Sequence, residues 1–322
     1  FLLPPEGIAQ ELARLVKMPY TILPSHVIEE TQVKEISDHS EELKKILAIV
    51  KTKSGVDFFH HYKHASIYRR VARRMVLNKL DRLDDYCSIL KTSPKEVDAL
   101  YDDFLINVTN FFRDHDFYKM LSKQVFPAIV KPETTESIRI WVAGCSTGEE
   151  AFSVAICLLE YLESKSIIRR IQIFASDLDL NAIEKARIGL YPAGAISGVP
   201  KNYLKKYFTR IDGHYQILKS VREYCVFSHH NLLKDPPFSR MDLISCQIVL
   251  IYLEANPQKK ILQTFHYALK ATGYLFLGKS ETIGSSGDMF EPLDKKIKIY
   301  SRKPTVSPQL EFTVSKPITA SP

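Results

Sequence analysis

The stretch Ile138–Ala155, IRIWVAGCSTGEEAFSVA, decides the fold. Ile138–Val142 is a short apolar run, which predicts a buried parallel strand. A turn of small residues follows, and Glu149 and Glu150 open a segment with apolar residues at helical spacing. A strand, a glycine turn and a helix start together form the usual cradle for a nucleotide-like ligand, because small residues let the backbone approach it.

The acids at this helix start indicate which ligand the turn accepts. The turn is neither G-x-G-x-x-G nor a P-loop, and an acidic pair disfavours a phosphate there. S-adenosylmethionine, a sulfonium with free ribose hydroxyls and no phosphate, suits an acidic site. Further on, Ile171–Ser176 predicts a second buried strand, which ends in Asp177. An acid in that place accepts hydrogen bonds from ribose hydroxyls, and the alternative role of Asp177 is to cap the next helix.

Composition limits the class of protein. The chain has 322 residues, with 45% hydrophobic and 25% charged residues, which predicts a soluble globular protein of one α/β domain and a small companion. No apolar run reaches membrane-spanning length, and no signal peptide opens the chain. The five cysteines are scattered without C-x-x-C, so we expect reduced thiols in the cytoplasm, with no zinc site and no disulfide frame.

The N-terminal part predicts helices. Residues 1–37 carry four prolines and are interpreted as a linker or the end of an upstream domain, and residues 38–105 as an all-α domain. Between Lys63 and Arg82 there are seven basic residues and one acid, and one helix face carries Arg69, Arg70, Arg73 and Arg74. Such a face is either simply solvated or a docking surface for an acidic partner. No aromatic platform accompanies it, which disfavours single-stranded nucleic acid.

The α/β domain is expected over residues 106–302. It opens with the junction NVTNFFR at Asn107–Arg113, and a small β-insertion is predicted at about 189–228, turned at Asp212-Gly213. Met241–Leu253 predicts a buried strand that runs into a loop. Gln258–Lys270 predicts a helix ended by Thr272-Gly273, with two final strands after it. Residues 303–322 are interpreted as a linker tail.

Two other kinds of site are disfavoured. His60, His61 and His64 include a pair at helical spacing, but no carboxylate or cysteine partner is evident near them, which favours an exposed surface over a metal site. No G-x-S-x-G elbow occurs, which argues against a serine hydrolase.

The motifs together resemble the chemoreceptor glutamate methyltransferases, the CheR family. The resemblance rests on NVTNFFRD, AGCSTGEEAFS, FASDLD, NLL and CQIVLIYL, and it covers roughly Ile46–Arg302. It implies a small basic helical domain followed by a Rossmann-like S-adenosylmethionine domain with a β-insertion. It also implies methyl transfer from S-adenosylmethionine to glutamate side chains of methyl-accepting receptors.

The resemblance also implies roles for particular residues. Arg113 and Tyr252 would serve catalysis, Tyr252 by placing the substrate carboxylate, and the four arginines would dock on acidic receptor helices. The cofactor would be lined by Asn107, Thr109, Arg113, Glu150, Asp177, Asn231, Leu232 and Gln247. A glutamate carboxylate, with an ordinary pKa of about 4.3, is already ionised at neutral pH, so we expect no catalytic base. The work left to the protein is alignment of the carboxylate and removal of water from it.

One departure from the family strand C-R-N-V-x-I-Y keeps a second function open. Gln247 and Ile248 stand where the family has arginine and asparagine, so a fixed charge is lost. The second hypothesis is therefore a catalytically impaired module that binds S-adenosylmethionine and acts in signalling or as a scaffold. A third, methylation of nucleic acid, is motivated by the arginine face but lacks an N/D-P-P-Y-type motif. The short tight Asp212-Gly213 turn is similar to family members that do not bind a receptor tail.

The first residues suggest a fusion. FLLPPEGIAQEL resembles the end of a receptor methylesterase domain. We therefore expect a piece of a fused multidomain signalling protein, with further domains on both sides and no direct membrane insertion.

Overall fold

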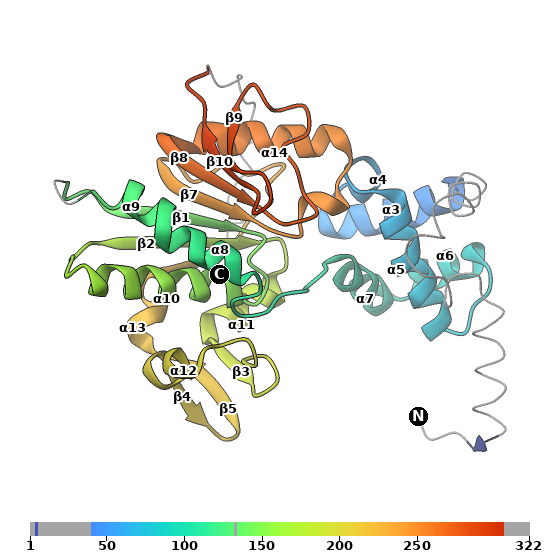
Figure 1. Cartoon of the computed structure of the whole chain (residues 1–322). Helices are drawn as coiled ribbons and strands as arrows, with labels where there is room; N and C mark the ends of the chain where they lie inside the picture. The colour runs from blue at the N-terminus through green and yellow to red at the C-terminus, as the bar shows by residue number, and fades with distance from the viewer. Residues whose placement is uncertain (1–3, 6–39, 132–133, 306–322) are drawn as a thin grey trace, which may run out of the picture. The chain divides into compact units, whose positions relative to one another are not determined.

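A computed structural model describes residues 4–5, 40–131 and 134–305. The chain divides into two compact units (Figure 1). The first takes the residues up to Ile106 together with Tyr252–Glu254, and the second takes the rest from Asn107 onward. The two expected linkers, 1–37 and 303–322, lie outside the described residues except for residues 4–5 and 303–305.

The first unit is helical, as the sequence predicts. Its described helices are α3 (Ser40–Ser54), α4 (Phe58–His61), α5 (His64–Leu77), α6 (Leu83–Thr92) and α7 (Pro94–Phe104). Their apolar faces meet in a core that includes Leu43, Ile46, Val71 and Leu100, each no more than 1% exposed. Ser93 caps α7 by accepting the backbone N–H of Glu96, and proline occupies the first turn, where its missing N–H costs nothing.

A short returning segment completes this unit. The backbone carbonyl of Tyr252 accepts the N–H of Lys63 over 2.8 Å, and the N–H of Glu254 donates to the carbonyl of His61 over 2.9 Å. Leu253 forms an isolated antiparallel bridge with Tyr62. The segment Tyr252–Glu254 therefore belongs to the helical unit through its backbone, although the chain on either side of it belongs to the second unit.

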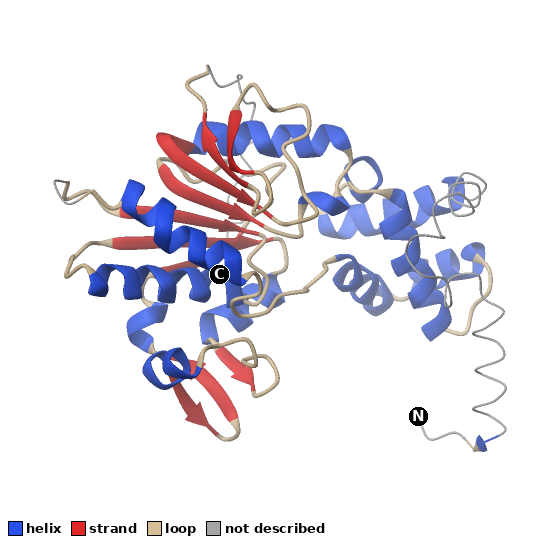
Figure 2. Cartoon of the chain, viewed as in Figure 1, coloured by secondary structure: helices blue, strands red, loops and turns tan. Residues whose placement is uncertain are grey.

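The second unit is built on a seven-stranded sheet with the order β6-β2-β1-β7-β8-β10-β9. The pairs from β6 to β8 are parallel, and β10 runs antiparallel between β8 and β9. Strands such as β7 are buried at every residue because helices cover both faces (Figure 2). The strands are β1 (Ile138–Ala143), β2 (Ile171–Asp177), β6 (Cys225–His229), β7 (Met241–Cys246), β8 (Leu269–Leu277), β9 (Phe290–Asp294) and β10 (Ile299–Arg302).

The helices of this unit follow from the strand order. The crossover from β1 to β2 runs one way along the sheet and that from β7 to β8 runs the other, so right-handed connections put α10 and α14 on opposite faces. The helices are α8 (His115–Met120), η1 (Leu121–Val125), α9 (Phe126–Ile129), α10 (Glu149–Ser164), α11 (Leu180–Ile188), α12 (Lys201–Tyr207), α13 (Lys219–Arg222) and α14 (Ala255–Ala268). The short helix η2 (Leu250–Tyr252) ends at the residue where the chain enters the first unit.

The order of the strands also locates the ligand crevice. From β1 the chain moves to β2 and β6 on one side, and it then returns to β7 on the other side of β1. This is a topological switch point, and ligands of open α/β sheets bind beyond the carboxyl ends of the strands there. The segments that leave β1 and β7 at this point begin with Gly144 and Gln247. The prediction of a Rossmann-like α/β domain with a small β-insertion, after an all-α part, is confirmed.

The β-insertion is shorter than expected. It contains a three-stranded sheet of order β3-β5-β4, formed by Leu190–Pro192, Phe208–Ile211 and His214–Ile217. The predicted turn is present, since Asp212 and Gly213 both have positive φ, +46° and +79°. The upper bound of 228 was wrong, because β6 pairs with β2 in the large sheet. As an edge strand, β6 leaves Val226 half exposed and does not show the pattern of a buried strand.

The stop predicted at Thr272-Gly273 was also wrong. Helix α14 ends at Ala268, and β8 begins at the next residue and runs through Thr272 and Gly273. The pairing of β8 with β7 shifts register near its start, between Met241 and Leu243 on the β7 side. An ideal Cβ on Gly273 would lie 3.0 Å from the Met241 carbonyl oxygen, so this glycine serves a close approach of two strands and does not end a helix.

Candidate functional site

The glycine turn after β1 has a backbone that favours small residues. Gly144, Ser146 and Gly148 have positive φ values of +74°, +48° and +95°. An ideal Cβ on Gly144 would lie 2.3 Å from Cγ2 of Val249, so no larger residue fits there without movement of the loop after β7. The turn and the loop after β7 are therefore in direct contact at the switch point.

Asp177 ends β2 and faces this turn. One carboxylate oxygen accepts the N–H of Ser146 over 2.7 Å, and the other accepts the N–H of Asp179 over 2.9 Å. Burial raises the pKa of Asp177, and these backbone hydrogen bonds oppose the rise. The capping alternative was wrong, because Asp179 caps α11 by accepting the N–H of Ala182 over 3.0 Å. Each carboxylate oxygen has two lone pairs, so Asp177 retains capacity for a ligand hydroxyl.

Asn107 joins the junction segment to the same turn. Its Nδ2 donates to Asp179 over 2.6 Å, and its Oδ1 accepts the hydroxyl of Ser146 over 2.8 Å. The structure thus brings together Asn107 and Asp177 from segments seventy residues apart. Thr109 is partly buried in the same junction segment.

Glu150, in the first turn of α10, is the second acid of the crevice. Its carboxylate accepts hydrogen bonds from the hydroxyl of Ser245 at the end of β7 and from the amide of Gln247. Burial raises the pKa of Glu150 to about 7, with the nearby carboxylates of Glu281 and Asp114 adding to the rise. The structure therefore places Gln247 beside Glu150.

Asn231 and Leu232 follow β6 at the same sheet edge. The preceding residue, His230, donates its N–H to the carbonyl of Asp177 over 2.9 Å, which ties this segment to β2. The side chain of Asn231 closes its own turn, because its Oδ1 accepts the N–H of Leu233 over 3.0 Å. Both predicted residues are partly exposed at the edge where Asp177 lies.

The two residues expected to act on the substrate lie in different units. Arg113 is exposed in the second unit, and its guanidinium donates to the carbonyl of Val108 over 3.2 Å. Tyr252 belongs to the first unit, where its backbone bonds to Lys63.

The four arginines of α5 are not equivalent. Arg69 and Arg73 are exposed, Arg73 with an ion pair to Asp103 at 2.7 Å, and Arg70 is partly buried. The side chain of Arg74 is 17% exposed and forms two hydrogen bonds with Glu96, at 2.9 and 2.5 Å. The expectation that all four arginines form one outward face does not hold for Arg74, because its guanidinium is paired with Glu96, a buried acid of α7.

The Glu96 cluster is a structural one. Its carboxylate also accepts the hydroxyl of Tyr86 and the amide of Asn78, each over 2.9 Å. Burial raises the pKa of Glu96, but the hydrogen bonds from Arg74 and Tyr86 outweigh burial, so the net pKa is lowered. The cluster stabilises the ionised carboxylate inside the helical unit.

One buried residue of the site was not predicted. Glu281 is 4% exposed, and its carboxylate accepts backbone N–H groups of the loop after β7. The available signal was an acid that follows a Gly-Lys-Ser sequence at the end of β8, beside the switch point.

The residues present fit S-adenosylmethionine. Gly144 provides a turn with no room for a Cβ, and Asp177 and Glu150 offer acceptors to hydroxyl or cationic groups. These two acids, with Asp114 and Glu281 near Glu150, make the crevice suited to a sulfonium and unsuited to a phosphate.

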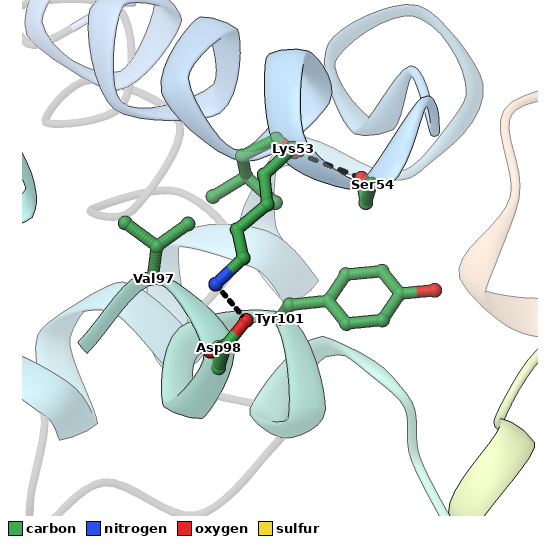
Figure 3. Close-up of a pocket in the computed structure, with 6 residues that line it drawn as sticks. Lys53, Ser54, Val97, Asp98 and Tyr101 are labelled. Atoms are coloured by element: carbon green, nitrogen blue, oxygen red, sulfur yellow. Dashed lines mark hydrogen bonds and ion pairs between the residues drawn. The ribbon is translucent and has the colours of Figure 1, made fainter. Parts of the chain in front are cut away.

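A separate small pocket lies between α3 and α7 of the helical unit (Figure 3). It has a volume of about 150 Å³ and is lined by Val50, Lys53, Ser54, Val97, Asp98 and Tyr101. The ammonium of Lys53 is paired with the carboxylate of Asp98 across it. The pocket contains none of the predicted site residues, and its two charged side chains, Lys53 and Asp98, are paired with each other.

The histidines of the helical unit have a carboxylate neighbour that the sequence analysis missed. Nδ1 of His60 lies 3.0 Å from an oxygen of Asp57, which also caps α4. Within the described ranges, no group of three or more His, Cys, Asp or Glu residues is arranged to hold a metal ion. Among the described helices, none combines the length and apolar character needed to cross a membrane.

Comparisons with known proteins place this chain in a family. Residues 41–105 match the CheR methyltransferase all-alpha domain, and residues 107–299 match the CheR methyltransferase SAM binding domain. A putative methyltransferase Cher3 of Pseudomonas putida is 31% identical, over 81% of this chain and 96% of that protein. A chemotaxis protein methyltransferase of Borreliella burgdorferi is 32% identical, over 76% of this chain and 88% of that protein.

A further relative is much longer. An uncharacterized 104.1 kDa protein of Rhodobacter capsulatus is 34% identical over 285 residues, and the chain spans 30% of its length. The matches cover both units and include the glycine turn, Asp177 and Glu150. The chain therefore belongs to the CheR methyltransferase family, with an all-alpha domain followed by a SAM binding domain.

Proposed function

We propose that this chain transfers a methyl group from S-adenosylmethionine to glutamate side chains of chemotaxis receptors in the cytoplasm. The observation that carries the proposal is the group of residues at the switch point, where Asp177 binds the backbone of the glycine turn and Glu150 opens the helix that follows this turn. Membership of the CheR family and the name of the relative from Borreliella burgdorferi support the receptor as substrate.

Different residues of the proposed site would bind different parts of S-adenosylmethionine. Asp177 would accept the ribose hydroxyls, with Asn107 holding the adjacent Ser146 in place. The carboxylate of Glu150 would stabilise the positively charged end of the cofactor, and the amide of Gln247 would donate a hydrogen bond to that carboxylate. We also propose contacts from Thr109, Arg113, Asn231 and Leu232. When bound, S-adenosylmethionine supplies an electrophilic methyl group on a positively charged sulfur.

The substrate carboxylate needs alignment more than activation. A glutamate side chain is ionised at neutral pH, with an ordinary pKa of about 4.3, so no residue has to remove a proton. Holding the carboxylate in line and stripping it of water are the contributions left to the protein. Arg113, whose side chain is exposed, is proposed to orient the carboxylate, and Tyr252 is kept as a second proposed catalytic residue.

The receptor would be recognised through α5. Arg69, Arg70 and Arg73 are proposed to dock on acidic helices, since opposite charges steer association and fix the register of two surfaces. We leave Arg74 out of this surface because its guanidinium is bound to Glu96.

The test is transfer of a labelled methyl group to a receptor cytoplasmic fragment. The expected product releases labelled methanol in mild alkali, as a methyl ester does and an N-methyl group does not. A fragment with glutamine at the methylation sites should accept no label. Arg113→Ala should lower the rate, while Arg187→Ala, an exposed arginine of α11, should leave it unchanged.

The same assay addresses the second hypothesis. If the chain binds S-adenosylhomocysteine but transfers no methyl group to any receptor fragment, it is a cofactor-binding signalling or scaffold module. The Gln247→Arg, Ile248→Asn double variant restores the family residues, and a gain of transfer in that variant alone would attribute the loss to these two positions.

A further inference from the structure

The loop after β7 is wrapped around one buried carboxylate. Oε1 of Glu281 accepts the backbone N–H groups of Val249, Leu250 and Ile251 over 2.9, 2.7 and 3.4 Å. Oε2 accepts those of Ile248 and Gly278 over 3.1 and 2.8 Å. In the described part of the chain, all the hydrogen bonds given for this carboxylate come from backbone N–H groups.

The loop held in this way has an unfavourable backbone. Ile248 has a φ of +59°, in the left-handed region that β-branched residues avoid. Such a conformation persists only where the surrounding structure holds it. The N–H of Ile248 is itself one of the groups bound by Glu281, so the carboxylate acts at the unfavourable residue.

The space around the carboxylate is tight. An ideal Cβ on Gly278 would lie 2.7 Å from Oε2 of Glu281 and 3.3 Å from the backbone nitrogen of Ile248. Any side chain at position 278 would therefore displace the carboxylate or the loop. The close approach of β8 to this loop depends on that glycine.

The same loop borders the proposed cofactor site. Gln247 donates to Glu150, and Val249 lies against Gly144 of the glycine turn. A change in the backbone at Ile248 would move both neighbours, one on each side of it. The conformation of the loop therefore determines where the Gln247 amide and the Val249 side chain lie relative to the glycine turn.

We propose that Glu281 is a positioning residue for S-adenosylmethionine binding. Its carboxylate holds residues 247–251 in the one conformation that places Gln247 beside Glu150 and Val249 against Gly144. Glu281 acts through the loop and exchanges no proton with the substrate. This inference rests on the proposed function only in taking the crevice as the site for S-adenosylmethionine.

The test compares Glu281→Gln, Ile248→Gly and the double variant, with Glu291→Gln on exposed β9 as control. Glutamine keeps the size of the side chain but turns one acceptor into a donor that faces N–H groups. We expect backbone hydrogen exchange at 248–251 to accelerate about tenfold in Glu281→Gln, and S-adenosylhomocysteine to bind about tenfold more weakly. Ile248→Gly removes the side chain that makes a positive φ unfavourable, so the double variant should regain at least about a third of the lost affinity.

A merely structural role would give another pattern. If Glu281→Gln lowers the melting temperature but leaves the exchange at 248–251 and the affinity unchanged in the folded protein, the inference is wrong. If Glu281→Gln does not fold, Gly278→Ala displaces the same carboxylate and should show the same two changes, and normal exchange with normal affinity there would overturn the inference. Failure of the unaltered chain to bind S-adenosylhomocysteine would count against the proposed function, while the exchange data would still decide the role of Glu281 in shaping the loop.

Discussion

The N–H of Ser146 donates to the carboxylate of Asp177 over 2.7 Å, which joins the turn after β1 to the end of β2. Because the N–H of Asp179 occupies the other oxygen, the carboxylate is fixed in orientation before any ligand arrives. A preoriented acceptor loses less conformational entropy on binding than a free one. Asp177 is therefore the residue on which the account of the cofactor site depends most.

Gly144→Ala should weaken cofactor binding strongly. The new Cβ would lie 2.3 Å from Val249, and the residue would also have a positive φ of +74°. We expect affinity for S-adenosylhomocysteine, measured by calorimetry, to fall more than about tenfold because the loop after β7 must move. Gly213→Ala is the matched control, since φ is +79° there and nothing lies within 4 Å of its Cβ. It should cost about 1 kcal/mol of stability without any loss of affinity.

Binding of S-adenosylmethionine should depend on pH through Glu150. With a pKa of about 7, Glu150 is largely neutral below neutral pH and ionised above it. We expect affinity to rise as pH increases through about 7, because the ionised form attracts the positive ligand. In Glu150→Gln that part of the pH dependence should vanish, and an unchanged profile in this variant would contradict the assignment.

The same group should lower the stability of the ligand-free chain as pH rises. The folded pKa of about 7 is above the ordinary value of 4.5, so between these values the folded state binds more protons than the unfolded state. Glu150 therefore contributes stability that is fully present below about pH 4.5. This contribution to the free energy of unfolding is lost as pH rises from 4.5 through 7. Thermal unfolding at about pH 8 should show Glu150→Gln to be more stable than the unaltered chain.

Arg74→Ala should destabilise the helical unit strongly. It leaves the carboxylate of Glu96, whose side chain is 10% exposed, without its cationic partner. Breaking a buried ion pair on one side costs about 3 kcal/mol, which urea unfolding can measure. Arg69→Ala, on the exposed side of the same helix, should change stability by less than about 0.5 kcal/mol. Equal effects of the two variants would contradict the distinction drawn between them.

Reversal of the exposed arginines should weaken receptor recognition without affecting the cofactor. We expect Arg69→Glu with Arg70→Glu to raise KM for a receptor fragment about tenfold at low salt, and to reduce the dependence of KM on salt. Affinity for S-adenosylhomocysteine should be unchanged. Arg82→Glu, an exposed arginine outside α5, serves as control, and a similar rise in KM there would mean that net charge and not α5 is recognised.

Local features of the site could be predicted from the sequence, and remote partners could not. The glycine turn and Asp177 each stand at a strand end, so strand pattern and spacing were enough to place them. Arg74 lies among three other arginines on the helical wheel, but its partner Glu96 comes from another helix, 22 residues away. Glu281 binds a loop 30 to 33 residues earlier in the chain through backbone N–H groups. Its position after β8 is visible in the sequence, but residue types do not indicate which backbone groups an acid binds.

Element boundaries failed for a similar reason. Strand β6 is an edge strand with one face exposed, so it could not be distinguished from the strands of the insertion beside it. Gly273 has the residue type that ends helices, but in the structure it allows β8 to approach β7. Both errors concern residues whose role depends on what lies across the sheet.

The cofactor site is tested by calorimetric binding of S-adenosylmethionine and S-adenosylhomocysteine to the chain and to Asp177→Asn. Asparagine keeps the shape of the side chain but removes one acceptor and the charge. We predict binding to the unaltered chain and at least about tenfold weaker binding to Asp177→Asn, since a charge-assisted hydrogen bond is lost. Glu184→Gln, an exposed acid on α11, should bind as the unaltered chain does. Absence of binding to the unaltered chain, or equal binding to Asp177→Asn, would contradict the account.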